Sequence, residues 1–213
     1  MDYAATVHLV DDDPSFLAAV GRMLRASGFK VAAHASAAEL LGSVSPESRG
    51  CVVADLSMPG VDGLELQALL AGRGIAMPIV FLTGHGDIPS SVRAMRSGAV
   101  DFLEKGAPRD NLLTAVTGAL DQDAAAHVAR QKVAERRRRL AALTEREREV
   151  LTLVARGNMN KQIAAALGIH ERTVKLHRTA ITTKLGVHTV AQLALLVNEA
   201  QLPDAVAKAA PGP

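Results

Sequence analysis

Aromatic residues and cysteine are the scarcest side chains in this sequence. Its 213 residues include no tryptophan, one tyrosine, four phenylalanines and one cysteine. A single cysteine excludes an internal disulfide and a four-cysteine zinc site. No apolar run reaches the length of a membrane span, and the first residues lack the pattern of a signal peptide. We therefore expect a cytoplasmic protein that has no membrane partner.

The net charge of +2 is the sum of two halves of opposite sign. Residues 1–123 carry 9 basic and 15 acidic side chains, whereas residues 124–213 carry 15 basic and 7 acidic ones. Such a division predicts two domains that have different partners. The basic domain is a candidate for binding the phosphate backbone of DNA.

The acidic half alternates short apolar runs with amphipathic helical patterns. The runs predict strands at residues 6–10, 29–34, 51–55, 78–82 and 100–104. The patterns predict helices at residues 14–27, 36–44, 63–70, 87–96 and 110–120. Five successive β-α units predict an α/β fold, a doubly wound five-stranded parallel sheet with helices on both faces.

Polar side chains stand at the carboxyl ends of four predicted strands. These ends share one edge of a parallel sheet, so the side chains should converge there. Neighbouring carboxylates repel one another, and Mg²⁺ relieves this repulsion because it prefers carboxylate, water and phosphate oxygens. A hydroxyl and an ammonium opposite an aspartate suit phosphoryl oxygens, which favours an aspartyl phosphate on Asp55. The converging residues are Asp11, Asp12, Asp13, Asp55, Thr83 and Lys105; Asp13 is expected to begin a helix rather than to bind a ligand.

Four motifs resemble the flavodoxin-like receiver domain of two-component response regulators over residues 5–121. They are VDD at 10–12, DLSMPGVDG at 55–63, TGHGD at 83–87 and GAVDFLEK at 98–105. The resemblance implies that Asp55 is the phosphoacceptor and that Thr83 and Lys105 bind the phosphoryl group. It also implies a switch role for Phe102. The implied Mg²⁺ ligands are Asp11, Asp12, Asp55 and the backbone carbonyl of Ser57.

One position departs from the receiver pattern. Receiver domains have Lys-Pro after the last strand, usually with a cis peptide, whereas here Gly106 follows Lys105 and Pro108 comes two residues later. A cis bond before a residue other than proline costs about 2.5–4 kcal/mol. We therefore expect a trans bond between Lys105 and Gly106, and a glycine backbone that uses φ values other residues avoid.

The basic half predicts helices throughout. Residues 124–143 contain no proline or glycine and predict a helical linker; the sequence leaves open whether this linker and the last receiver helix form one long helix. Residues 144–202 predict an all-α domain with helices at 144–156, 161–167, 171–185 and 189–199. The glycine-containing turn between the second and third of these helices predicts a helix-turn-helix. The Ala/Pro/Gly-rich tail, residues 203–213, is predicted to be disordered.

Three motifs in this half resemble the LuxR-type DNA-binding domain over residues 141–201. They are LTEREREVL at 143–151, NKQIA at 160–164 and TVKLHR at 173–178. The whole chain therefore resembles the FixJ/NarL family and is nearest to the FixJ group. His170 stands where the family usually has a Ser or Thr cap. The resemblance implies base-edge contacts from Lys175, Leu176 and Thr179, and phosphate contacts from Lys161, Thr173, His177, Arg178 and Lys184.

Together these features predict a phosphorylation-dependent transcription regulator. A sensor histidine kinase would phosphorylate Asp55 in the presence of Mg²⁺, two receivers would then pair through Val92 and Arg96, and the dimer would bind promoter DNA. RNA polymerase is a further expected partner. We expect no enzyme activity beyond accepting the phosphoryl group and hydrolysing it.

Two alternatives remain open at this point. One is a DNA-binding regulator that works without phosphorylation. The other is an aspartyl-phosphate phosphatase with Asp11 as its nucleophile, which leaves residues 141–201 unexplained.

Overall fold

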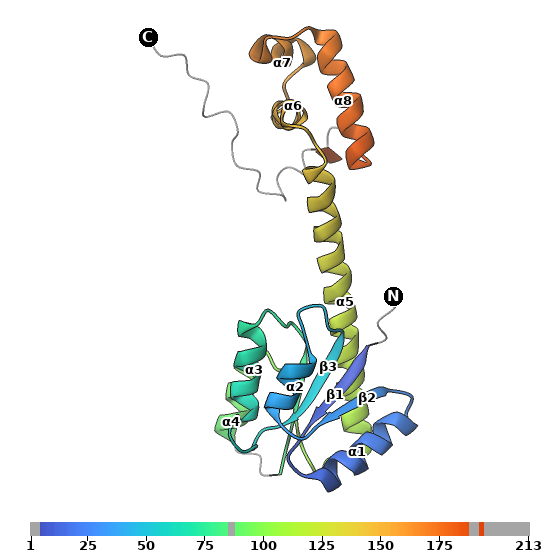
Figure 1. Cartoon of the computed structure of the whole chain (residues 1–213), viewed down its shortest axis with the longest axis vertical. Helices are drawn as coiled ribbons and strands as arrows, with labels where there is room; N and C mark the ends of the chain where they lie inside the picture. Colours follow the sequence, from blue (N-terminus) through green and yellow to red (C-terminus); the bar gives the residue numbers. More distant parts are fainter. Residues whose placement is uncertain (1–4, 85–87, 188–191, 194–213) are drawn as a thin grey trace. The chain divides into compact units, whose positions relative to one another are not determined.

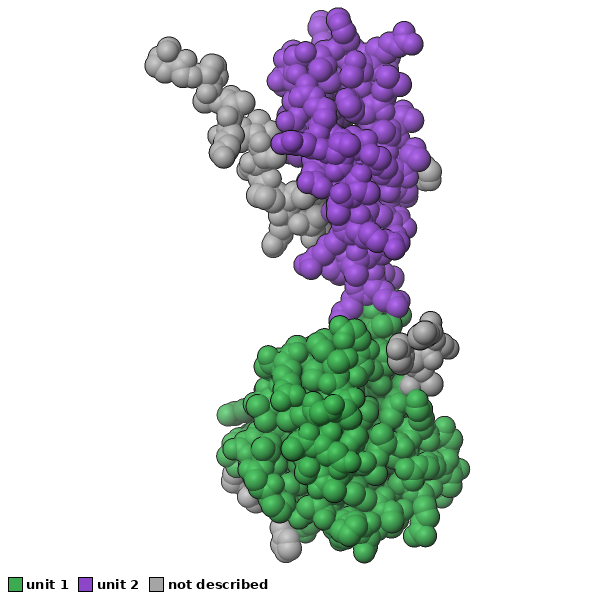
Figure 2. Space-filling model, viewed as in Figure 1, with its two compact units in different colours: residues 1–128 green, residues 129–213 purple. Residues whose placement is uncertain are grey.

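The computed structural model describes residues 5–84, 88–187 and 192–193. The chain forms two compact units, residues 1–128 and residues 129–213 (Figure 2). The division falls within one helix, α5, which runs from Arg109 to Ala141. The linker is therefore helical as predicted, and it is continuous with the last receiver helix, a point that the sequence leaves open. Among the described residues, no helix is long and apolar enough to cross a membrane.

The first unit is a five-stranded parallel sheet with the strand order β2-β1-β3-β4-β5 (Figure 1). This architecture confirms the predicted doubly wound α/β fold. The strands are β1 (Thr6–Val10), β2 (Lys30–His34), β3 (Gly50–Asp55), β4 (Ile79–Thr83) and β5 (Asp101–Glu104). The helices are α1 (Pro14–Ala26), α2 (Ala37–Ser43), α3 (Gly63–Gly72), α4 (Ile88–Arg96) and the first part of α5.

Each face of the sheet carries its own apolar layer. Val10, Val52 and Phe81 pack in one buried cluster that includes side chains from α2, α3 and α4. Leu9 and Val53 pack in the opposite cluster, together with side chains of α1 and α5. Successive strand residues point to opposite faces, so a sheet that is covered on both sides needs apolar side chains at successive positions.

Local interactions fix the loops that follow β1 and β3. The Asp13 carboxylate accepts hydrogen bonds from the backbone N–H groups of Ser15 and Phe16, which confirms that Asp13 begins α1. After β3, the N–H of Gly63 donates to the carbonyl of Leu56 at 2.9 Å. A Cβ on Gly63 would lie 2.6 Å from the backbone oxygen of Asp55, so only glycine allows α3 to begin this close to the end of β3.

The second unit contains three described helices besides the end of α5: α6 (Glu145–Ala155), α7 (Asn160–Leu167) and α8 (Glu171–Leu185). Gly168 adopts a left-handed conformation with φ of 64° and ends α7, forming the predicted turn of the helix-turn-helix. The helix α8 begins at Glu171 although the His170 side chain makes no capping hydrogen bond. The predicted helix at 189–199 lies outside the described residues except at 192–193, and the tail at 203–213 lies wholly outside them. The core of this unit includes Leu140, Leu143, Val150, Leu151, Val154, Ile163, Val174, Ile181 and Leu185.

Candidate functional site

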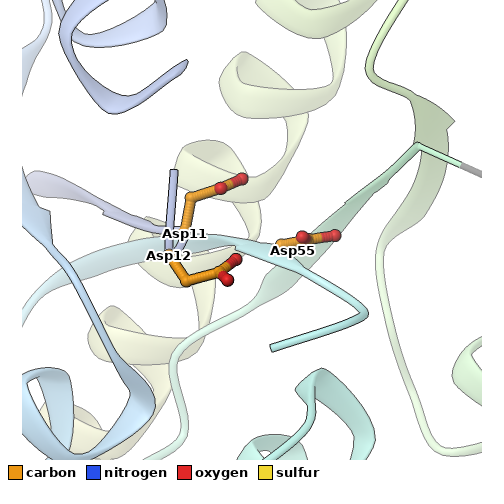
Figure 3. Close-up of side chains that lie close together, drawn as sticks. All are labelled: Asp11, Asp12 and Asp55. Atoms are coloured by element: carbon orange, nitrogen blue, oxygen red, sulfur yellow. The ribbon is translucent and has the colours of Figure 1, made fainter. Parts of the chain in front are cut away.

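Three carboxylates meet at the carboxyl edge of the sheet. Asp11 and Asp12 follow β1, and Asp55 ends the neighbouring strand β3. One oxygen of each carboxylate lies within 4.8 Å of the others (Figure 3). Asp11 and Asp55 are buried, whereas Asp12 is exposed. The structure thus brings together the three acidic residues that the sequence places at strand ends, with one of them open to solvent.

Lys105 joins this cluster from the end of β5. Its ammonium Nζ lies 2.7 Å from Asp11 Oδ2 and 3.0 Å from Asp55 Oδ2. Burial lowers the pKa of Lys105, but the two carboxylates outweigh this effect, so the pKa is raised above its ordinary value. Lys105 therefore remains protonated and neutralises part of the acidic cluster. Thr83, the last residue of β4, is buried at the same edge of the sheet.

The cluster fits a hard divalent cation. Three carboxylates and one ammonium leave a formal charge of −2 in a partly buried site. The buried Asp11 carboxylate already pairs with the Lys105 ammonium through Oδ2 at 2.7 Å and accepts from the backbone N–H of Asp13 through Oδ1 at 2.9 Å, so one ammonium serves two of the three carboxylates. Mg²⁺ takes oxygen ligands and usually keeps several waters, which matches two buried carboxylates and one exposed one. The N–H of Ser57 donates to Asp55 Oδ1 at 3.3 Å, so the loop after β3 turns back to Asp55.

The turn after β5 agrees with one expectation for Gly106 and contradicts another. There is no cis peptide bond in the described chain, so the bond between Lys105 and Gly106 is trans as predicted. The expectation of unusual φ values at Gly106 is wrong, because its backbone does not adopt the left-handed conformation. A Cβ on this residue would have no other atom within 4 Å. An ordinary turn, in which the N–H of Ala107 donates to the carbonyl of Glu104 at 2.9 Å, already brings Lys105 into the site.

The helix α4 and strand β5 carry the predicted switch and pairing residues. Phe102 on β5 is half-buried and packs against the apolar layer shared with α2, α3 and α4. Val92 and Arg96 are both exposed on α4, on which Ala94 faces the core. Met95 is also exposed, which the sequence analysis missed. The structure thus places apolar side chains in solvent on α4, and the pairing and switch roles of these residues stay predictions.

The helix α8 divides into a buried face and an outward face. Val174, Ile181 and Leu185 are buried in the core. Leu176 is 65% exposed, which is unusual for a leucine in a small domain. The remaining predicted DNA-contacting residues divide by burial: Lys161, Lys175 and Thr179 are exposed, and Thr173, His177 and Arg178 are half-buried.

Two of the predicted phosphate contacts also join helices within the second unit. Lys184 Nζ lies 2.9 Å and 2.7 Å from the two carboxylate oxygens of Glu147 on α6. Arg178 Nη1 donates to Asn160 Oδ1 on α7 at 2.9 Å. Glu147 is buried, and the hydrogen bond from Lys184 lowers its pKa most, followed by the bond from Thr144. No sequence signal marks either pair, because the partners lie 37 and 18 residues apart.

Two family models match these two units. The response regulator receiver domain matches residues 7–117, and the domain described as bacterial regulatory proteins, luxR family, matches residues 141–197. The chain belongs to the response regulators that carry a LuxR-type DNA-binding domain. This confirms the family and the fold expected from the motifs.

Full-length relatives support the same assignment for this response regulator. It is 43% identical to Nodulation protein W of Bradyrhizobium diazoefficiens over 89% of this chain and 83% of the relative. It is 39% identical to the transcriptional regulatory protein FixJ of Azorhizobium caulinodans over 96% and 99% of the two chains. Among solved structures, the response regulator StyR has a TM-score of 0.86 and 44% identity, with 92% of this chain and 99% of that chain covered.

Proposed function

We propose that this response regulator is activated in the cytoplasm when a sensor histidine kinase phosphorylates Asp55, and that the phosphorylated protein dimerises on promoter DNA. The main support for the proposal is that the Lys105 ammonium lies between the carboxylates of Asp11 and Asp55. It places a positive charge beside the Asp55 oxygens, where the negatively charged phosphoryl group must arrive.

The transfer forms one bond and breaks another. An Asp55 carboxylate oxygen attacks the phosphorus of the kinase phosphohistidine, and the P–N bond breaks as the imidazole leaves. The Lys105 ammonium, now 3.0 Å from Asp55 Oδ2, then pairs with a phosphoryl oxygen, and the Thr83 hydroxyl donates to another. Asp11, Asp12, Asp55 and the Ser57 carbonyl would hold Mg²⁺, which supplies further neutralisation of the phosphoryl charge. The only turnover is hydrolysis of this aspartyl phosphate.

Phosphorylation is coupled to pairing through β5 and α4. Thr83 moves toward the phosphoryl group, and Phe102 turns inward to fill the space that Thr83 leaves. The altered face of α4, which carries exposed Val92 and Arg96, then pairs with the same face of a second copy. A symmetric dimer presents two helix-turn-helix units to a two-fold DNA site.

The outward face of α8 supports the proposed DNA contacts. Lys175, Leu176 and Thr179 are exposed and would read base edges in the major groove. The proposed phosphate contacts come from the surrounding polar residues, and they set the register and the salt dependence of binding. RNA polymerase is the proposed partner at the promoter. The residues proposed to contact phosphates are Lys161, Thr173, His177, Arg178 and Lys184.

The proposal is tested by comparing wild type with Asp55→Asn. Each protein is incubated with acetyl phosphate and Mg²⁺, and the intact mass is measured over time. We expect a phosphoryl adduct on wild type that is absent without Mg²⁺ and absent from the variant. An adduct that forms equally on the variant would show that Asp55 is not the acceptor. Circular dichroism of the variant controls for loss of fold.

A further inference from the structure

An aromatic ring lies against the ammonium of Lys105. The Nζ atom is 4.6 Å from the centroid of the Phe16 ring. Phe16 stands in the first turn of α1, three residues after the Asp13 cap, and its backbone N–H is one of the groups that Asp13 holds. The same loop and helix end therefore supply Lys105 with both a carboxylate partner, Asp11, and an aromatic face.

The rest of the loop around Lys105 encloses it poorly. A cavity of about 250 Å³ lies beside the lysine, between α1 and the turn after β5, and its lining includes Val20, Met23, Ala107 and Leu112 as well as Phe16 and Lys105. The next residue, Gly106, has no side chain to pack, and a Cβ there would touch nothing. The turn sets the position of the Lys105 backbone, whereas the ammonium is held by its contacts with Asp11, Asp55 and Phe16.

The ring can hold the ammonium without competing for its hydrogen bonds. A cation within about 6 Å of an aromatic centroid is attracted to the face of the ring, and the attraction is stronger where water is excluded. The N–H groups remain directed at oxygen atoms. When Lys105 exchanges an Asp55 oxygen for a phosphoryl oxygen, the attraction to Phe16 persists. A hydrogen-bond acceptor in place of the ring would act differently. Lys105 would have to break its hydrogen bond to that acceptor, or the bond would pull the ammonium away from the phosphoryl group.

We propose that Phe16 is a positioning residue that aims Lys105 at the phosphoryl group during transfer to Asp55. The inference rests on the proposed function of Asp55. It assigns to α1 a part in the chemistry, in addition to its packing against the sheet.

The test compares phosphorylation rates by acetyl phosphate at saturating Mg²⁺. Phe16→Leu keeps an apolar side chain but removes the aromatic face, and we expect a rate about three- to tenfold lower than that of wild type. Phe16→Tyr keeps the face and should restore the rate to within about twofold of wild type. Phe29→Leu is the matched control, because Phe29 packs against the same apolar cluster as Phe16. Equal slowing by Phe29→Leu, or no rescue by Phe16→Tyr, would overturn the proposal.

A double-mutant cycle separates positioning from a structural role. In a Lys105→Ala background, Phe16→Leu should cause no further slowing, because the ring acts through the lysine. A full additional loss in that background would overturn the inference. Wild type that acquires no adduct, or an adduct that persists in Asp55→Asn, would instead refute the proposed function. Normal Asp55 labelling combined with an unchanged rate for Phe16→Leu would refute only the role of Phe16.

Discussion

Replacement of Lys184 by glutamine should destabilise the second unit. The Glu147 side chain is only 7% exposed and takes two hydrogen bonds from Lys184, whose own side chain is 36% exposed. Loss of the charged partner of a buried carboxylate usually costs several kcal/mol of folding free energy. The cost is smaller here, because solvent reaches the lysine side of the pair and screens it. Glu147 also keeps the backbone N–H of Thr144 at 2.7 Å. We therefore expect a loss of about 1–3 kcal/mol in the free energy of unfolding of this unit.

Hydrogen exchange followed by mass spectrometry shows which helices of Lys184→Gln lose stability. Peptides from α6 and α8 should exchange faster in Lys184→Gln, while peptides from the sheet of the first unit should be unchanged. Lys161→Gln is the matched control, because Lys161 is an exposed lysine on α7. It should leave exchange unchanged but flatten the salt dependence of DNA binding by about one unit of slope. Unchanged exchange in α6 and α8 of Lys184→Gln would refute the structural role of the pair.

The pair also predicts a dependence on pH. Lys184 lowers the pKa of Glu147 in the folded protein, so the folded state binds fewer protons than the unfolded state near that pKa. The stabilisation of the folded state is therefore complete above pH 4.5, the ordinary pKa of glutamate, and it is lost as the pH falls through the lowered pKa of Glu147. In urea titrations, the difference between wild type and Lys184→Gln should shrink over that acidic range.

Three further predictions concern other parts of the chain. Val92→Asp should block the phosphorylation-induced dimer in light scattering while intact mass still shows the adduct; a normal dimer would place the interface elsewhere. Lys175→Ala should change the preferred DNA sequence in a selection experiment, and an unchanged preference would refute its base contact. Burial, aided by His34 and Lys30, lowers the pKa of His8 to about 4, so His8 should remain neutral by NMR down to about that pH. Because the unfolded chain protonates near the ordinary value of 6.5, stability should fall between these two values as the pH is lowered, and His8→Gln should reduce that fall.

Much of the acidic cluster at the edge of the sheet follows from local sequence patterns. Short apolar runs locate the strands, and parallel topology then places Asp11, Asp55 and Lys105 at one edge, as the structure shows. One strand begins a residue earlier than predicted, at Gly50. A Cβ there would lie 1.9 Å from the Thr6 backbone oxygen, so glycine lets β3 start directly against β1. Hydrophobic periodicity gives no sign of such close backbone contact.

The contacts that could not be predicted join side chains across the fold. From the sequence, Lys184 is an isolated cation on the second helix of the helix-turn-helix, but the structure places Glu147 of α6 against it. The ring of Phe16 looks like ordinary core until α1 places it beside Lys105. Each pair depends on the angle at which two elements pack, which a single sequence does not encode in any local pattern. The φ of Gly106 was mispredicted for the same reason, since the turn it occupies is set by its surroundings.

We propose that phosphorylation of Asp55 controls DNA binding. The most direct measurement is the affinity of the full chain for a promoter fragment that the acetyl-phosphate-treated protein enriches from genomic DNA. We expect tighter binding by wild type when acetyl phosphate and Mg²⁺ are both present, and no change for Asp55→Asn under the same conditions. Equal affinity of wild type with and without acetyl phosphate, at a measured high level of Asp55 phosphorylation, would show that phosphorylation does not control DNA binding.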